Sequence, residues 1–243
     1  MPYPLIRGLK IFRQQKVDCK ISMPFSSFKE ITCVLLDMDG TLLDRYFDDY
    51  FWEHLVPERY AEKHKITFGK AKEKLFKRYK AHEGTLNWTD IDFWSRELEL
   101  DIMALKEQIR HLIEVHPHVE DFLKMLKTRK IKTFIVTNAH YKVLDMKLKK
   151  TDLGKYLTGA ITSFEIGFPK EKMEFWQRAE QRLGFSKEKT ILIDDTLEVL
   201  KTAQKFGIKH LVYKARANSK LKPFPSSEFM TILDFSELMT EGL

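Results

Sequence analysis

The chain has 243 residues, of which 43% are hydrophobic and 32% are charged. This composition is typical of a folded globular protein and argues against an intrinsically disordered chain. No apolar run in the sequence approaches the roughly 18 residues that a membrane-spanning helix requires. We therefore expect neither a membrane protein nor a membrane partner.

The formal net charge is +7. Lysines and acids are interleaved along stretches such as KAKEKLFKRYK, and no nucleic-acid-binding motif accompanies them. We expect a solvated basic surface and no nucleic-acid partner, with mild attraction of phosphorylated small molecules as the alternative. The two cysteines, Cys19 and Cys33, do not form a disulfide framework, which favours a cytoplasmic location.

The chain begins with a basic segment, residues 1–28, which lacks the continuous apolar core and small-residue cleavage site of a signal peptide. We predict an N-terminal extension of unknown role. Short apolar runs follow and predict five strands: Ile31–Leu36, Ile131–Val136, Ala160–Ile161, Thr190–Ile193 and Ile208–Tyr213. Helical patterns lie between the later runs, at His118–Arg129, Tyr141–Lys150, Lys172–Leu183 and Leu197–Phe206.

Strands that alternate with helices of this length predict βαβ units and a Rossmann-like parallel sheet. Gly184 and Gly207 stand where two of these helices are expected to end. We expect this α/β core to be discontinuous, with residues 29–45 and 117–215 on either side of an insertion.

The insertion, residues 46–116, contains no convincing strand but several aromatic-rich helical patterns. Asp101 is the expected N-cap of one of these helices. We predict a separate, all-helical domain here. Residues 216–243 contain two prolines and one weak helical pattern, and we interpret them as a C-terminal tail.

Polar side chains gather where the predicted strands end. In chain order they are Asp37, Asp39, Thr137, Asn138, Lys170, Asp194 and Asp195. Because the carboxyl ends of parallel strands meet at one edge of a sheet, these groups are expected to converge there. Crowded carboxylates without a His or Cys cluster favour Mg²⁺. A magnesium site with a spare carboxylate and a lysine suits phosphoryl transfer, with one Asp as nucleophile and the second as general acid and base.

The motif DMDGT, followed by Thr-Asn, a lysine and Asp-Asp, resembles the haloacid dehalogenase superfamily over about Ile31 to Tyr213. The resemblance implies that Asp37 is the nucleophile that becomes aspartyl-phosphate and that Asp39 is the acid and base. It also implies that Thr137 and the backbone of Asn138 hold the phosphate.

The same resemblance assigns Lys170 to neutralise the nucleophile and the phosphate. It gives Mg²⁺ four ligand residues, namely the carboxylate of Asp37, the carbonyl of Asp39, and Asp195 supported by Asp194. The third motif departs from the usual Lys-Pro pattern, because Glu171 stands where proline is common. Lys172 is therefore a rival for the role of Lys170.

The helical insertion resembles the cap domain of this superfamily, and its sequence resembles the cap of bacterial GMP/IMP 5′-nucleotidases in YFWEHLVPERY and GTLNWTDIDFWSRELELDI. The expected activity is hydrolysis of purine nucleoside 5′-monophosphates, with Asn87 and Trp88 in contact with the substrate. Trp52 and Trp94 stand at helical spacing, which favours the cap's own core. The alternatives are a sugar-phosphate or phosphoglycolate-type phosphatase or phosphomutase, and a non-catalytic nucleotide-binding protein.

Overall fold

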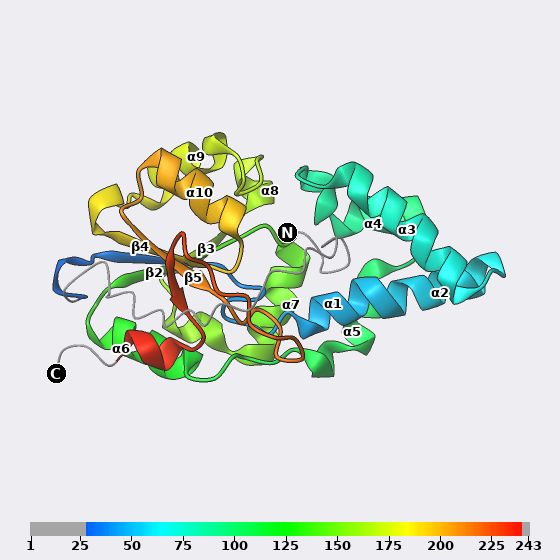
Figure 1. Ribbon diagram of the computed structural model, residues 1–243, viewed down its shortest axis with the longest axis horizontal. Coiled ribbons are helices and arrows are strands. Elements are labelled where there is room, and N and C mark those ends of the chain that lie inside the picture. Colours follow the sequence, from blue (N-terminus) through cyan, green and yellow to red (C-terminus); the bar gives the residue numbers. More distant parts are fainter. Residues whose placement is uncertain (1–27, 240–243) are drawn as a thin grey trace.

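The structure is a computed structural model that describes residues 28–239. Residues 1–27 and 240–243 lie outside the described range, and with them nearly all of the predicted N-terminal extension and Cys19. The described chain forms a six-stranded parallel sheet flanked by helices, together with a helical insertion (Figure 1). This arrangement confirms the predicted fold class.

The strands follow the spatial order β3-β2-β1-β4-β5-β6, which is the order of a doubly wound Rossmann sheet. Their bounds are β1 Cys33–Leu36, β2 Lys132–Thr137, β3 Gly159–Thr162, β4 Thr190–Asp194, β5 His210–Lys214 and β6 Met230–Ile232. The five predicted strands are confirmed to within two residues at each end. The sixth, β6, was not predicted; it pairs with β5 through contacts such as Tyr213 with Thr231.

Helices cover both faces of the sheet. On one face, α6 (Val119–Thr128) and α7 (Tyr141–Thr151) pack against the cluster that holds Leu36 and Ile135. On the other, α8 (Ser163–Ile166), α9 (Met173–Leu183) and α10 (Leu197–Phe206) pack against Leu35 and Leu192. Because β1 is buried on both faces, its sequence CVLL is apolar throughout instead of alternating.

The glycines and acids at the helix ends act as the sequence indicates. Gly184 and Gly207 end α9 and α10 in the left-handed region, at φ of +63° and +105°. Asp101 caps α5 (Ile102–Gln108), where its side chain accepts a hydrogen bond from the backbone N–H of Ala104.

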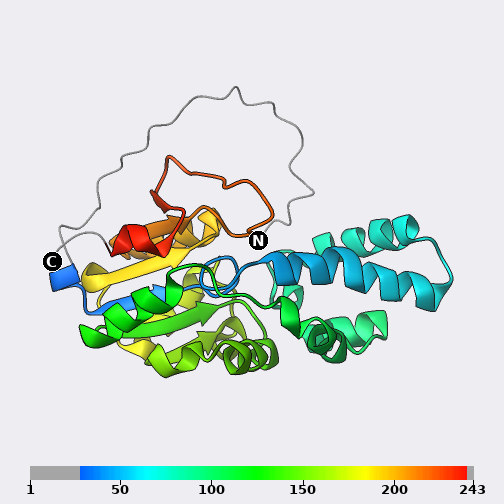
Figure 2. The same ribbon diagram turned by 90° about the horizontal axis from the view of Figure 1, so that it is seen from below.

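The insertion leaves the sheet directly after β1 and returns at α6. Its helices are α1 (Tyr46–Tyr50), a π-helical segment (Phe51–Leu55), α2 (Val56–His64), α3 (Phe68–His82), α4 (Ile91–Leu98) and α5. Figures 1 and 2 show these helices extending from one side of the α/β core. The exact domain bounds, 29–45, 46–116, 117–215 and 216–243, remain predictions.

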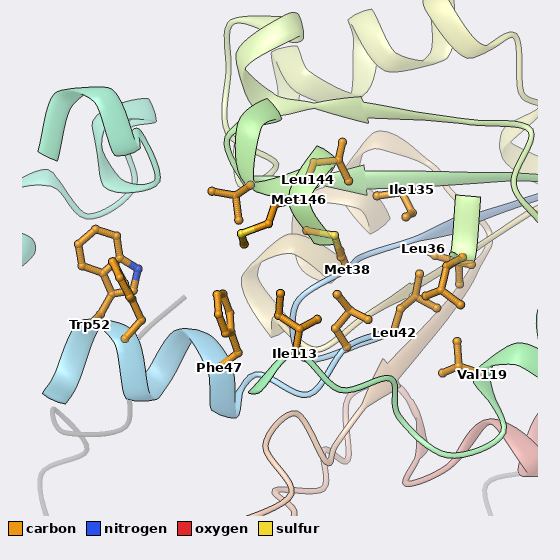
Figure 3. Close-up of a cluster of buried hydrophobic side chains, with 14 of the residues drawn as sticks. Leu36, Met38, Leu42, Phe47, Trp52, Ile113, Val119, Ile135, Leu144 and Met146 are labelled. Carbon is orange, nitrogen blue, oxygen red and sulfur yellow. The ribbon is translucent and has the colours of Figure 1, made fainter. Parts of the chain in front are cut away.

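An apolar cluster continues from the sheet into the insertion. Leu36 and Met38 lie on the sheet side, and Ile113 and Phe47 lead toward Trp52 in the insertion (Figure 3). Two backbone hydrogen bonds, from Asp44 N to Glu114 O and from His116 N to Leu42 O, join the two connecting segments. The insertion is thus packed onto the core along its connections. None of the helices within residues 28–239 is long and apolar enough to cross a membrane.

Candidate active site

A tight turn after β1 carries the first two acids. The strand ends at Leu36, and the backbone N–H of Asp37 still donates to Ile193 O at 3.0 Å. Gly40 has a φ of +98°, and a Cβ atom at this position would lie 2.5 Å from Asp195 Oδ2. Only glycine allows both this backbone conformation and this close approach. The turn after β1 therefore lies directly against Asp195, the residue that follows β4.

Lys170 is the lysine that reaches these acids. Its Nζ donates to Asp37 Oδ1 at 2.6 Å and to Asp194 Oδ2 at 2.7 Å, and all three side chains are buried. The two acids raise the pKa of Lys170 despite its burial. Lys172 is exposed at the start of α9, so the alternative lysine does not contact the acids.

Asn138 positions the loop that carries Lys170. Its Oδ1 accepts from the backbone N–H of Lys170 at 2.9 Å, and its Nδ2 donates to Glu171 Oε2 at 2.9 Å. Thr137 is buried beside it, and its Oγ1 accepts from the backbone N–H of Ala139 at 3.0 Å. The side chain of Asn138 thus links the end of β2 to the loop between α8 and α9, a contact that the sequence did not predict.

Three carboxylates lie close together at the strand ends. Asp37, Asp194 and Asp195 each offer an oxygen within 4.8 Å of the others. Burial raises the pKa of Asp37 and of Asp195 to about 7 and that of Asp194 to about 6, although Lys170 and Arg45 partly oppose the shift. The structure therefore concentrates more negative charge here than these two cations neutralise.

The donor set fits a hard divalent cation. Asp37 Oδ2 is buried and has no hydrogen-bond partner among residues 28–239. A buried carboxylate oxygen without a partner is costly, and an oxygen-ligated cation such as Mg²⁺ offsets that cost. Arg45 Nη1 lies 2.8 Å from Asp195 Oδ2 and supplies positive charge on the other side of the cluster.

Asp39 does not share the Lys170 contact. Its Oδ1 accepts from Lys147 Nζ at 2.6 Å, and Lys147 also pairs with Asp48 of the insertion. Lys106 Nζ donates to the other oxygen of Asp48 at 2.8 Å. Our sequence analysis missed these three charged residues. The available signal was Lys147 itself, a lysine within the apolar stripe formed by Val143 and its neighbours on α7.

One cavity joins the acids to the insertion. It is lined by Asp37, Asp39 and Lys170 from the core and by Trp52, Trp88 and Lys106 from the insertion. Trp52 also packs edge-on against Trp94, which is buried in the insertion and does not line the cavity. Asn87 is not among the described lining residues either, so its contact with a substrate stays a prediction.

A second contact between insertion and core lies beside this cavity. Lys142 Nζ donates to both oxygens of Asp92 at 2.8 Å, which joins α7 to α4. His140, whose side chain is 4% exposed, lies 3.7 Å from Asp92 and 3.9 Å from Asp90. Lys142 pairs with Asp92, and Asp90 Oδ1 accepts hydrogen bonds from the backbone N–H groups of Asp92 and Phe93, so these acids have partners among the described residues, unlike Asp37 Oδ2.

Residues 31–207 match the family of haloacid dehalogenase-like hydrolases. The chain belongs to this family. It is 33% identical over 213 residues to the GMP/IMP nucleotidase YrfG of Escherichia coli strain K12, which covers 88% of this chain and 96% of that relative. The corresponding protein of Shigella flexneri has the same identity and coverage. The protein is therefore an enzyme, a phosphatase of the haloacid dehalogenase family.

Solved structures agree on the fold. A haloacid dehalogenase phosphatase from Thermococcus onnurineus superimposes with a TM-score of 0.73 at 24% identity, over 86% of this chain and 96% of that one. A protein from Thermotoga maritima, described as a putative beta-phosphoglucomutase, superimposes with a TM-score of 0.61 at 17% identity, over 86% and 97%. At these identities the likeness concerns the fold alone.

Proposed function

We propose that this phosphatase hydrolyses purine nucleoside 5′-monophosphates, GMP and IMP, to nucleoside and phosphate through an aspartyl-phosphate intermediate. The observation that carries the proposal is the buried cluster of three carboxylates around Lys170 at the carboxyl ends of the strands. A nucleophile, a cation site and a neutralising lysine are the parts that phosphoryl transfer requires. The expected compartment is the cytoplasm.

Asp37 is the nucleophile in this proposal. Its carboxylate oxygen attacks phosphorus, the bond from phosphorus to the ester oxygen breaks, and the leaving oxygen takes a proton from Asp39. Water then attacks the aspartyl-phosphate while Asp39 accepts a proton from that water, which restores Asp37 and releases phosphate. The position of Asp37 on the lining of the cavity supports this role, because a phosphoryl group held there lies within reach of its carboxylate.

Lys170, Thr137 and Asn138 bind and orient the reacting groups. Lys170 neutralises Asp37 and the transferred phosphoryl group, and its contact with Asp37 at 2.6 Å supports this role. We assign phosphate binding to Thr137 and to the backbone of Asn138, and both residues line the cavity. Preorganised donors of this kind stabilise the charge of the transition state without reorganisation.

Asp37, Asp194 and Asp195, with the carbonyl of Asp39, are the proposed magnesium ligands. When bound, Mg²⁺ supplies positive charge that polarises the phosphoryl oxygens. Gly40 has no side chain, and this lets the turn that carries Asp37 and Asp39 approach Asp195.

The substrate class follows from the relative and from the cavity. The curated relative at 33% identity is described as a GMP/IMP nucleotidase and spans nearly the whole chain. Trp88 and Trp52 line the cavity on the insertion side, and a purine ring can stack on such side chains. We retain Trp88 and Asn87 as proposed substrate contacts.

A sugar-phosphate phosphatase is the second candidate. A Thermotoga maritima relative, 22% identical over 189 residues, is described as a phosphorylated carbohydrates phosphatase. It covers 73% of this chain and 82% of that relative. A phosphomutase uses a similar site, and a purely nucleotide-binding protein would need neither Asp37 nor Asp39.

The test is phosphate release from a panel of nucleoside and sugar monophosphates, with and without Mg²⁺. We expect the highest kcat/KM with GMP and IMP, and activity that is lost with EDTA and restored by Mg²⁺. Activity confined to sugar phosphates would reject the nucleotidase assignment. No phosphate release from any monoester would reject the proposed chemistry.

A further inference from the structure

A buried chain of alternating charges connects the acid/base residue to the insertion. It runs from Asp39 on the β1 turn to Lys147 on α7, then to Asp48 on α1 and Lys106 on α5. Lys147 is only 1% exposed and Lys106 only 2%. Asp39 and Lys147 belong to the core, whereas Asp48 and Lys106 belong to the insertion.

The surroundings of this chain are apolar. Lys147 Nζ lies 5.0 Å from the centre of the Phe47 ring, and Lys106 Nζ lies 4.8 Å from the same ring. Phe47 belongs to the apolar cluster that joins the sheet to the insertion (Figure 3). Charges in such surroundings attract one another more strongly than charges in water, and they are costly when unpaired. The buried lysines are therefore held firmly by their carboxylate partners.

Lys147 lies outside the reaction itself. It is not among the described residues that line the cavity, whereas Asp39 does line it. Lys147 therefore reaches the reacting atoms through Asp39. A general acid must stand within hydrogen-bond reach of the leaving oxygen, and a misplacement of about 1 Å can cost a factor of about 10² in rate.

We propose that Lys147 is a positioning residue that fixes the carboxylate of Asp39 for proton transfer, and that Asp48 of the insertion in turn fixes Lys147. This inference rests on the proposed function, because it assigns Asp39 the proton that the leaving oxygen takes. The acid/base group is then assembled by both parts of the molecule. Asp48 lies in α1, directly after the chain leaves the core, so the placement of the insertion is linked to the placement of Asp39.

The test is the dependence of kcat/KM on the leaving group. Formation of the aspartyl-phosphate needs a proton on the leaving oxygen of a nucleoside, but the p-nitrophenolate oxygen leaves without one. For Lys147→Met we expect kcat/KM for GMP to fall at least about tenfold, because general acid catalysis contributes about 10²–10⁴. For p-nitrophenyl phosphate we expect a fall of less than about threefold, because little acid catalysis is lost there.

A double-mutant cycle separates positioning from a general structural effect. In an Asp39→Asn background, the added Lys147→Met is expected to change kcat/KM for GMP by less than about twofold, because residues that act together are not additive. Lys149→Met is the matched control, since Lys149 lies on the same helix and pairs with Asp145 at the surface. We expect wild-type kinetics for this control.

Two results would overturn the inference. One is an equal loss with GMP and with p-nitrophenyl phosphate in Lys147→Met, and the other is an additive loss in the double variant. If Lys147→Met does not fold, the same kinetics are measured for Asp48→Asn. A fall in kcat/KM for GMP that exceeds the fall for p-nitrophenyl phosphate supports the inference, and an unchanged ratio of the two kcat/KM values rejects it. A wild type that releases no phosphate from any monoester would reject both this inference and the proposed function, whereas an active wild type with an unselective Lys147→Met rejects the inference alone.

Discussion

Asp37 is a carboxylate at the end of a buried strand, where an uncompensated charge destabilises a protein. Asp194 and Asp195 add like charge, whereas Lys170 and Arg45 compensate only part of it. The pKa values of these acids, raised by burial to about 7, about 6 and about 7, report the cost of ionising them without a metal. The site thus concentrates like charge, which is the setting for the magnesium ion that we propose.

The raised pKa values predict how stability depends on pH in a buffer without metal. Between about pH 4 and pH 7 the folded protein holds protons that the unfolded chain has released. The free energy of unfolding is therefore expected to fall as pH rises through this interval and to stay low above it. Thermal unfolding with EDTA at a series of pH values measures this fall.

Magnesium is expected to reverse the trend, because it binds the ionised acids of the folded protein. At a concentration 100 times Kd, binding adds about 2.7 kcal/mol, and each kcal/mol raises Tm by about 2–4 °C for a chain of this size. The increase in Tm should be larger at pH 8 than at pH 5. The Asp145→Asn variant, changed at the surface, is the control and should behave as wild type. An increase in Tm that does not depend on pH would contradict this account.

The sequence revealed the residues around Asp37 because their positions follow from the topology. Acids and a Thr-Asn pair at successive strand ends must meet once the sheet is parallel, and Lys170 reaches them from the loop between α8 and α9. The contacts of Asp39 could not be found in this way. Lys147 lies 108 residues from Asp39, and Asp48 lies in the insertion, so their pairing depends on how the insertion packs. Only the apolar setting of Lys147 on α7 hinted at it.

At the scale of elements, a compact group of aromatic side chains lies within the insertion. Trp94 on α4 is 1% exposed, and its ring centre lies 5.0 Å from that of Tyr79 on α3 and 6.1 Å from that of Trp52. Its Nε1 donates to the backbone oxygen of Trp88 at 3.2 Å. Trp94 thus supports both the helix pair and the turn that carries a proposed substrate contact.

Trp94→Ala is expected to lower the free energy of unfolding of the insertion by about 3–5 kcal/mol, because it leaves a large cavity. Hydrogen exchange should increase in α3 and α4, while β1 and β2 keep their protection. Trp94→Phe keeps most of the packing and loses one hydrogen bond, so a cost of about 1 kcal/mol is expected. Equal loss of protection in the sheet would show that the insertion is not a separate unit.

Element prediction succeeded where helical and strand patterns were long or were bounded by glycine. The predicted bounds of α10 match the observed ones because Gly207 ends a clear helical pattern. The strand β6 spans three residues and has no such pattern. It forms because the neighbouring edge of β5 is available, which is tertiary information that a local pattern does not contain.

At the scale of the whole molecule, the segment after β5 contacts the point where insertion and core join. Ala217 O accepts from the backbone N–H of Arg45 at 2.9 Å and lies 3.3 Å from His116 Nε2. Asn218 Nδ2 donates to Asp49 Oδ2 at 2.6 Å, and both side chains are buried. Residues from three distant parts of the sequence therefore stabilise the connection.

Asn218→Ala is expected to lower the free energy of unfolding by about 1–3 kcal/mol, because it removes a hydrogen-bond donor from a buried carboxylate. Urea denaturation measures this change. Ser219→Ala is the matched control, because Ser219 contacts Asp44 through its backbone N–H, which alanine keeps. The two variants having equal stability would contradict the proposed contribution of Asn218.

The central claim is that Asp37 carries the phosphoryl group during turnover. The direct measurement mixes an Asp39→Asn variant, which cannot activate water, with Mg²⁺ and p-nitrophenyl phosphate, whose leaving oxygen needs no proton from Asp39. The mixture is quenched in acid and the modified peptide is located by mass spectrometry. We predict that the peptide containing Asp37 gains the mass of one phosphoryl group and that Asp37→Asn abolishes the gain. Two results would contradict the account, provided that the wild type releases phosphate. One is a quenched variant with no phosphoryl group on Asp37, and the other is a phosphoryl group on a different residue.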